Sequence, residues 1–277
     1  MIGFVVSMLM LLTTASAVLP ATSAAVPFTC SDALSKVAVC PDDVTLTANG
    51  AGQSVSGEAV DFAGNRATAK LTGIDIDEEK PAITLGGIAN GATYALGAAP
   101  VASCSAKDDV SGAVSCAVTV SGGKANGVGQ FAYTATAKDK AGNTTTQTGS
   151  YKVVYRFDGF LQPINDTAHQ IGATTSIFKA GSTVPVKLQL KRADGTKVQA
   201  RGAPIWEVPV KGSPTTAPVD ESVYGVAADS AAAYRWDSAD QQYIYNWGTD
   251  AAGKASYYRI GVMLDDGQTY FVNIGLR

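Results

Sequence analysis

Apolar and polar residues alternate along short stretches of this chain, which is the pattern of β-strands with one buried face. Phe131, Tyr133, Ala135 and Ala137 fall on one face of such a stretch, and the threonines between the last three fall on the other. Turn residues separate these stretches at the spacing typical of antiparallel sandwiches. The pattern therefore predicts an all-β fold.

A second alternating stretch lies in the C-terminal half. Val184, Val186, Leu188 and Leu190 share one face, and an Asp-Gly pair at Asp194 follows closely. Asp-Gly suits the positive φ angles of a tight hairpin. We expect a strand and a reversal here.

The first half of the chain contains a sequence repeat in two copies. Each copy has a cysteine pair, a Gly-Gln step and an Ala-Gly-Asn turn. The first copy contains Cys30, Cys40, Gly52-Gln53 and Ala63-Gly64-Asn65, and the second contains Cys104, Cys116, Gly129-Gln130 and Ala141-Gly142-Asn143. Such a repeat indicates tandem β modules rather than a catalytic domain.

The second copy carries a family resemblance. Its Cys-Ser-Ala-Lys-Asp-Asp-Val-Ser-Gly-Ala-Val-Ser-Cys, followed by Thr-Ala-Lys-Asp-Lys-Ala-Gly-Asn, resembles bacterial extracellular immunoglobulin-like repeats of the hyalin-repeat-like kind. The resemblance covers residues 81–155 and implies an immunoglobulin-like β-sandwich. The first copy is shorter and has no obvious strand ahead of Cys30, so we expect a partial module there.

The repeat pattern ends at residue 155, and all three tryptophans lie beyond that point. Residues 157–164 read Phe-Asp-Gly-Phe-Leu-Gln-Pro-Ile, and residues 178–190 contain Val-Pro-Val-Lys-Leu. This part resembles the PxKF domain of secreted bacterial proteins, with Leu188 where phenylalanine is usual. The resemblance implies a C-terminal β-sandwich-like domain and defines no activity.

The N-terminus has the features of a secretory signal. An apolar run from Ile2 to Leu12 precedes two small-residue cleavage sites, Ala15-Ser16-Ala17 and Thr22-Ser23-Ala24, although no Lys or Arg precedes the run. An uncleaved membrane anchor is the alternative, but a span needs about 20 apolar residues. The expected organisation is a signal peptide (1–25), a partial immunoglobulin-like repeat (26–79), an immunoglobulin-like sandwich (80–155) and a PxKF-like β domain (156–277).

Four cysteines in an exported chain favour disulfides. Four cysteines allow three pairings, and the repeat favours the local one, Cys30 with Cys40 and Cys104 with Cys116, because each copy would then be stapled independently. Zinc is the alternative. The spacings match no zinc pattern and the chain has one histidine, so zinc is not favoured.

Composition and charge limit the classes of binding partner that we expect. Apolar residues make up 46% of the chain and charged residues 16%, with a net charge of −3, which is typical of a folded domain. Since no basic runs occur, we expect neither nucleic acid nor, after signal cleavage, membrane as a partner. Extracellular polysaccharide or a surface protein remains a candidate partner.

Catalytic motifs are missing from the sequence. It has no Gly-x-Ser-x-Gly elbow and no His-Glu-x-x-His pair, and His169 lies in a polar stretch that predicts a solvated loop. A carboxylate-pair glycosidase needs no sequence signature, so that alternative stays open. The preferred interpretation is a non-enzyme without a cofactor.

Aromatic residues gather in the C-terminal part. Tyr243, Tyr245 and Trp247 alternate on one face, and Tyr234 and Trp236 precede them across an expected turn. Such a row can stack sugars on an exposed surface, or it can form the core of a sandwich. The core is the preferred interpretation, with a carbohydrate platform as the alternative.

Acidic residues mark the junction between the copies. Asp75, Asp77 and Glu78 precede Pro81, and Asp108-Asp109 follow in the second copy. Carboxylate oxygens are calcium ligands, and calcium at this junction is one hypothesis. A solvated linker is the other and is preferred.

Together these observations predict a bacterial protein, secreted or displayed at the cell surface, that acts in extracellular adhesion, display or spacing. A carbohydrate-binding accessory module is the first alternative. The second is the C-terminal fragment of a larger surface protein or enzyme.

Overall fold

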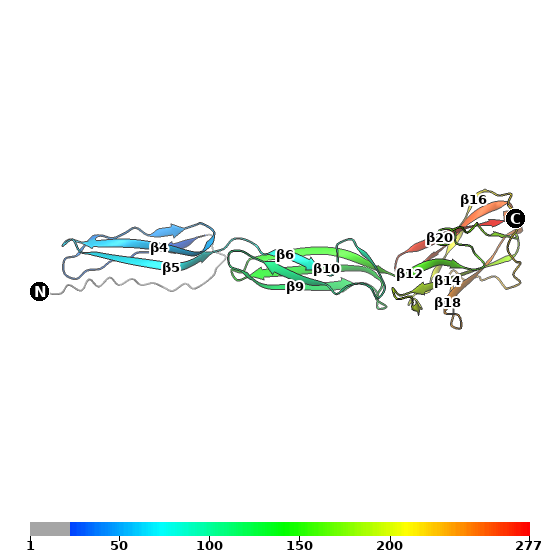
Figure 1. Ribbon diagram of the computed structural model, residues 1–277, viewed down its shortest axis with the longest axis horizontal. Coiled ribbons are helices and arrows are strands. Elements are labelled where there is room, and N and C mark those ends of the chain that lie inside the picture. Colours follow the sequence, from blue (N-terminus) through cyan, green and yellow to red (C-terminus); the bar gives the residue numbers. More distant parts are fainter. Residues whose placement is uncertain (1–22) are drawn as a thin grey trace. The chain divides into compact units, whose positions relative to one another are not determined.

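A computed structural model describes residues 23–277 of the protein (Figure 1). The described chain is built from strands, with one short 3₁₀-helix, η1 (Ala251–Gly253), among them. The predicted all-β fold class is confirmed. The expected signal peptide lies largely outside the described residues, and its expected end at residue 25 falls inside strand β1 (Ala24–Val26).

Each sheet takes its strands from one of three consecutive stretches of the chain, residues 24–76, 82–154 and 156–276. Grouped by compactness, the chain forms two units. The described part of the first contains residues 23–86, 102–119 and 134–148, and the second contains residues 87–101, 120–133 and 149–277. The unit boundary therefore crosses strands β9 (Ala113–Gly122), β10 (Gly129–Asp139) and β11 (Thr144–Val154).

The first stretch forms two small sheets. One pairs β1 with β3 (Val44–Leu46), and the other has the order β2 (Val37–Val39), β4 (Gly50–Asp61) and β5 (Arg66–Ile76). Strand β1 precedes Cys30 and pairs with β3, so the expectation that no strand leads this copy is wrong. Its core contains Val26, Phe28 and Val55. Gly57 leaves room for the Phe28 ring, which would lie 2.5 Å from an added Cβ.

The second stretch also forms two sheets. One pairs β6 (Ala82–Gly86) with β8 (Ser103–Lys107), and the other has the order β7 (Thr93–Ala95), β11 (Thr144–Val154), β10 (Gly129–Asp139) and β9 (Ala113–Gly122). Along β10, Tyr133, Ala135 and Ala137 are buried and the two threonines between them are exposed. The predicted alternation is confirmed.

The third stretch contributes a five-stranded and a four-stranded sheet. The first has the order β12 (Arg156–Leu161), β14 (Thr183–Lys191), β18 (Gln242–Gly248) and β17 (Arg235–Asp237), with β15 (Lys197–Val198) on β14. The second has the order β13 (Ile177–Phe178), β20 (Thr269–Leu276), β19 (Ser256–Met263) and β16 (Ile205–Pro214). The four predicted core residues of β14, from Val184 to Leu190, are fully buried, and β14 and β15 form the predicted hairpin.

Candidate functional site

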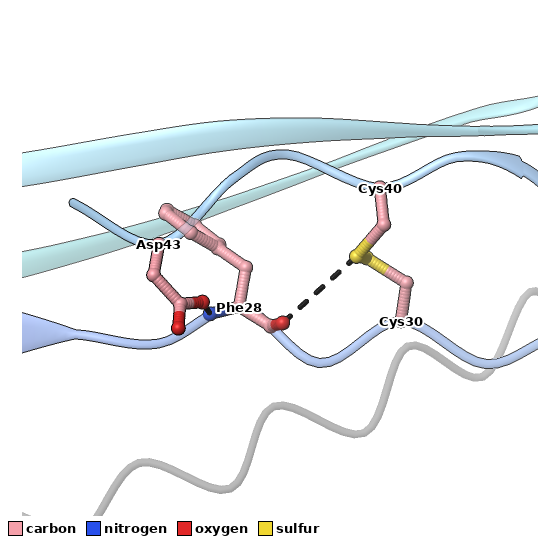
Figure 2. The surroundings of a disulfide bond; sticks show 4 residues. All are labelled: Phe28, Cys30, Cys40 and Asp43. Atoms are coloured by element: carbon pink, nitrogen blue, oxygen red, sulfur yellow. Dashed lines mark hydrogen bonds between the residues drawn. A yellow bond between two sulfur atoms is a disulfide. The ribbon is translucent and has the colours of Figure 1, made fainter.

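Both local disulfides predicted from the repeat are present. Cys30 is bonded to Cys40 and Cys104 to Cys116, with Cα atoms 5.8 Å apart in each pair. Figure 2 shows the first of them beside Phe28, whose main-chain nitrogen donates a hydrogen bond of 2.9 Å to the Asp43 carboxylate. Each disulfide therefore closes a short loop within its own copy and leaves no free thiol among the described residues.

The aromatic row of the C-terminal part lies mainly in the interior. Tyr234, Tyr243 and Tyr245 are buried, whereas Trp236 and Trp247 are half-buried. Tyr245 stacks on Trp206 with ring centroids 4.4 Å apart. The three tyrosines therefore belong to the core, as the preferred interpretation held, and they do not form an exposed carbohydrate platform.

The Tyr243 hydroxyl has a structural partner. It accepts a hydrogen bond of 2.8 Å from the main-chain nitrogen of Ala200, in a buried setting. Burial raises the pKa of Tyr243 to about 12. This hydroxyl therefore stays protonated and serves the fold.

Three aspartates from separate elements meet in the first compact unit. One carboxylate oxygen each from Asp77, Asp108 and Asp139 lies within 4.8 Å of the other two. Asp77 follows the last residue of β5, Asp108 follows β8, and Asp139 is the last residue of β10. We call these three residues the acidic cluster. Strand ends and the loops after them therefore bring the side chains together.

Main-chain amides hold one oxygen of each carboxylate. Asp77 Oδ1 accepts from the Glu79 nitrogen at 2.9 Å, and Asp139 Oδ1 accepts from the Asn143 nitrogen at 2.8 Å. Asp108 Oδ1 accepts from the nitrogens of Ser111 and Gly112. Burial raises the pKa of Asp108, but these amide hydrogen bonds outweigh it and hold that pKa below its usual value. The turns thus fix the orientation of the three carboxylates.

The second oxygens of two of these carboxylates have no partner. Asp77 is fully buried and Asp139 is 1% exposed, and among residues 23–277 no donor reaches Oδ2 of either. Two like unit charges within 4.8 Å of each other repel by roughly 3.5 kcal/mol or more at an effective dielectric constant of about 20. Buried oxygens of this kind ordinarily have a hydrogen bond or a cation. The acidic cluster is therefore a candidate metal centre built only of oxygen ligands.

The acidic cluster differs from the one predicted at the junction. Asp77 and Asp108 come together as expected, and Asp139 is an addition. Asp75 instead accepts a hydrogen bond of 2.7 Å from the Gly52 nitrogen, Glu78 has an exposed side chain, and Asp109 pairs with Lys107 at 2.7 Å on the surface. These last three residues do not contribute to the cluster.

Sequence reasoning missed Asp139, although a signal was present. In both copies an aspartate, Asp61 or Asp139, lies two residues before the alanine of the Ala-Gly-Asn turn. The geometry of a tight turn accounts for the glycine and the asparagine, but it gives no reason to single out the aspartate as a ligand. His169 lies in a turn and is exposed, as predicted; its Nδ1 also lies 3.0 Å from the buried Asp166 carboxylate, and its ring contacts Phe157 edge-on.

Comparison with known proteins gives no family. No protein-family profile matches the chain. No curated protein matches it either. None of the helices in residues 23–277 has the length and apolar character needed to cross a membrane.

Solved structures of extracellular proteins align over much of the chain at low identity. The protocadherin GammaB4 extracellular domain shares 10% identity over 92% of this chain and 43% of its own, with a TM-score of 0.28. The Escherichia coli adhesin FdeC shares 11% over 82% and 74%, with a TM-score of 0.23. Surface layer protein SbsC, domains 4–9, shares 15% over 87% and 37%, with a TM-score of 0.21. At these TM-scores the similarity carries no argument about function.

Proposed function

We propose that the protein is a non-catalytic modular protein, secreted or held at a bacterial cell surface, that acts in extracellular adhesion, display or spacing. The observation that carries the proposal is that the sheets follow one another along the chain and that each copy of the repeat has a local disulfide bond. Each sheet is completed within one stretch of the chain, and each copy of the repeat closes its own disulfide. Disulfides persist in oxidising compartments, which supports an extracellular location.

The local disulfides suit a protein whose small β modules must stay folded outside the cell. Small β modules gain stability when a disulfide limits their unfolded states, by about 3 kcal/mol for loops of this size. A disulfide within one copy stabilises that copy independently of its neighbours. Its candidate partners remain an extracellular polysaccharide or a surface protein.

The carbohydrate-binding alternative is the weaker one. A sugar platform needs exposed ring faces, and three of its five candidate aromatics are buried. Tyr234 and Tyr245 both pack against Trp206, and Tyr243 packs against Trp236. We therefore do not place the adhesive surface at this row.

A retention assay tests the proposal. The full chain is displayed on a non-adherent bacterial host, and cells are washed under flow over surfaces coated with polysaccharides or extracellular proteins. We expect retention on at least one coating, abolished when the display is competed with soluble chain. Retention equal to that of the undecorated host on every coating would argue against adhesion.

A further inference from the structure

The Ala-Gly-Asn turns of the two copies share one hydrogen-bonding framework. The residue after the turn's aspartate donates from its main-chain nitrogen to a carbonyl in the cysteine loop, Phe62 to Lys36 and Lys140 to Gly112, both at 3.1 Å. In each copy the asparagine nitrogen also donates to Oδ1 of the aspartate. Asp61 and Asp139 are therefore equivalent positions in one repeated turn.

In the first copy, protein groups satisfy the aspartate fully. Ser35 Oγ lies 2.5 Å from Asp32 Oδ2 and 2.7 Å from Asp61 Oδ2, so it can donate its one proton to either carboxylate. The side-chain amide of Asn65 donates to Asp61 Oδ2 at 2.7 Å. The Ser35 and Asn65 hydrogen bonds hold the pKa of Asp61 below its usual value. This turn needs no ion.

In the second copy, both of those donors are directed elsewhere. The Asn143 amide donates to the main-chain oxygen of Asp77 at 3.0 Å, not to Asp139. Ser111 Oγ lies 3.4 Å from Asp108 Oδ1 and does not reach Asp139. A third carboxylate, Asp77, takes the place next to Asp139. The same turn is therefore left with buried, unpartnered oxygens at Asp77 and Asp139.

From this difference we infer that Asp77, Asp108 and Asp139 form a Ca²⁺ site, which the equivalent turn of the first copy does not have. One Ca²⁺ contacts oxygens at 2.3–2.6 Å, so ligand oxygens on opposite sides of it lie about 4.8 Å apart. The cluster meets that limit. A Ca²⁺ ion there offsets two of the three carboxylate charges and provides a partner for the two buried oxygens.

The ligand chemistry selects calcium over other metals. Zinc and most transition metals prefer imidazole or thiolate, and the four cysteines are disulfide-bonded. Magnesium needs near-ideal octahedral geometry and retains several waters, whereas calcium accepts irregular sets of carboxylate oxygens. The ion ties the segment after β5 to the loop after β8 and to the turn after β10.

Calorimetric titration of the chelator-treated full chain with CaCl₂ tests the site. We expect one Ca²⁺ per chain, with an affinity in the range of extracellular calcium modules, about 10⁻⁴ to 10⁻³ M. The variant Asp139→Asn keeps the oxygen that accepts the turn's amides but removes the charge. It should bind Ca²⁺ about tenfold more weakly or not at all, because calcium affinity follows the number of charged ligands. Asp77→Asn should do the same.

Asp61→Asn is the matched control, since it makes the same change at the equivalent turn. It should keep wild-type Ca²⁺ binding. Three results would each overturn the site: no saturable binding of CaCl₂ up to about 10 mM, equal loss in Asp61→Asn and Asp139→Asn, or MgCl₂ binding as tightly as CaCl₂.

Thermal unfolding provides a second readout that a purely structural aspartate would not move. In chelator, Asp139→Asn should unfold at or above the wild-type temperature, because it relieves repulsion. In CaCl₂ it should unfold below wild type, because only the wild type gains the ion. The same deficit in both conditions would mean that Asp139 only supports the turn, and the inference would fail.

Discussion

The side-chain amide of Asn143 donates a hydrogen bond to the main-chain oxygen of Asp77, 3.0 Å away and 66 residues earlier in the chain. Its counterpart Asn65 makes only a local bond, to Asp61 four residues earlier. The same turn residue thus makes a local hydrogen bond in the first copy and a hydrogen bond to a distant segment in the second.

Replacing Asn143 by alanine should release that segment. We expect residues 77–80 to exchange their amide hydrogens faster, because a hydrogen bond of this kind contributes about 0.5–1.5 kcal/mol. Hydrogen-exchange mass spectrometry of the full chain measures this. Asn65→Ala should leave the exchange rates of residues 77–80 unchanged. Unchanged exchange in Asn143→Ala would show that the Asn143 hydrogen bond does not hold the segment.

The buried tyrosines predict a large loss of stability on truncation. Tyr245→Ala should cost about 3–5 kcal/mol, because it removes a large ring from a packed core. Urea unfolding followed by tryptophan fluorescence reports on this region, since Trp206, Trp236 and Trp247 all lie there. Val208→Ala on β16 is the control: its side chain is exposed, so the midpoint should not move. A fully stable Tyr245→Ala variant would place the ring outside the core.

The Tyr243 hydroxyl predicts a smaller, specific effect. Tyr243→Phe keeps the ring but leaves the buried Ala200 nitrogen without an acceptor. The expected loss is about 1–3 kcal/mol, the cost of an unpaired buried donor. The same urea measurement checks it, and a loss as large as that of Tyr243→Ala would mean that the hydroxyl is not the main contribution.

Asp266 predicts a pH dependence in the C-terminal part. Burial raises the pKa of Asp266 above its ordinary value of 3.8, although its Oδ2 accepts from the Tyr155 nitrogen at 2.8 Å. A raised folded-state pKa gives a contribution to stability that is present below pH 3.8 and is lost as pH rises through the raised value. The difference in unfolding free energy between wild type and Asp266→Asn should therefore shift against the wild type across that window.

Tryptophan-detected urea unfolding at a series of pH values measures that difference. Asp237 provides the opposite case, because a hydrogen bond from Gln242 and the Ala239 amide lower its pKa. Its contribution is present above the ordinary pKa and is lost on acidification. A difference for Asp266→Asn that does not vary with pH would contradict the assignment.

The sequence was sufficient for features that depend on local pattern. Alternation identified the buried faces of β10 and β14, Asp-Gly marked the turn between β14 and β15, and the repeat selected the disulfide pairing. Each of these follows from residues close together in the chain.

Features that depend on which segments meet in space could not be obtained in this way. Asp77, Asp108 and Asp139 are about 30 residues apart from one to the next, and only the sheet topology brings them together. The burial of Tyr245 likewise depends on Trp206 from the opposite sheet. Alternation located the aromatic row but could not reveal that a second layer covers it.

The central claim is the proposal that the chain consists of folded β modules that act outside the cell, with a local disulfide in each copy of the repeat. Pulling single molecules of the full chain by its ends tests this most directly. The disulfides span 10 and 12 residues. At roughly 3.5 Å per residue, less the 5.8 Å already spanned by each pair of Cα atoms, reduction should lengthen the unfolded chain by about 29 Å and about 36 Å in separate steps, after force peaks that mark module unfolding. Extension without force peaks, or an extension unchanged by reduction, would contradict the account.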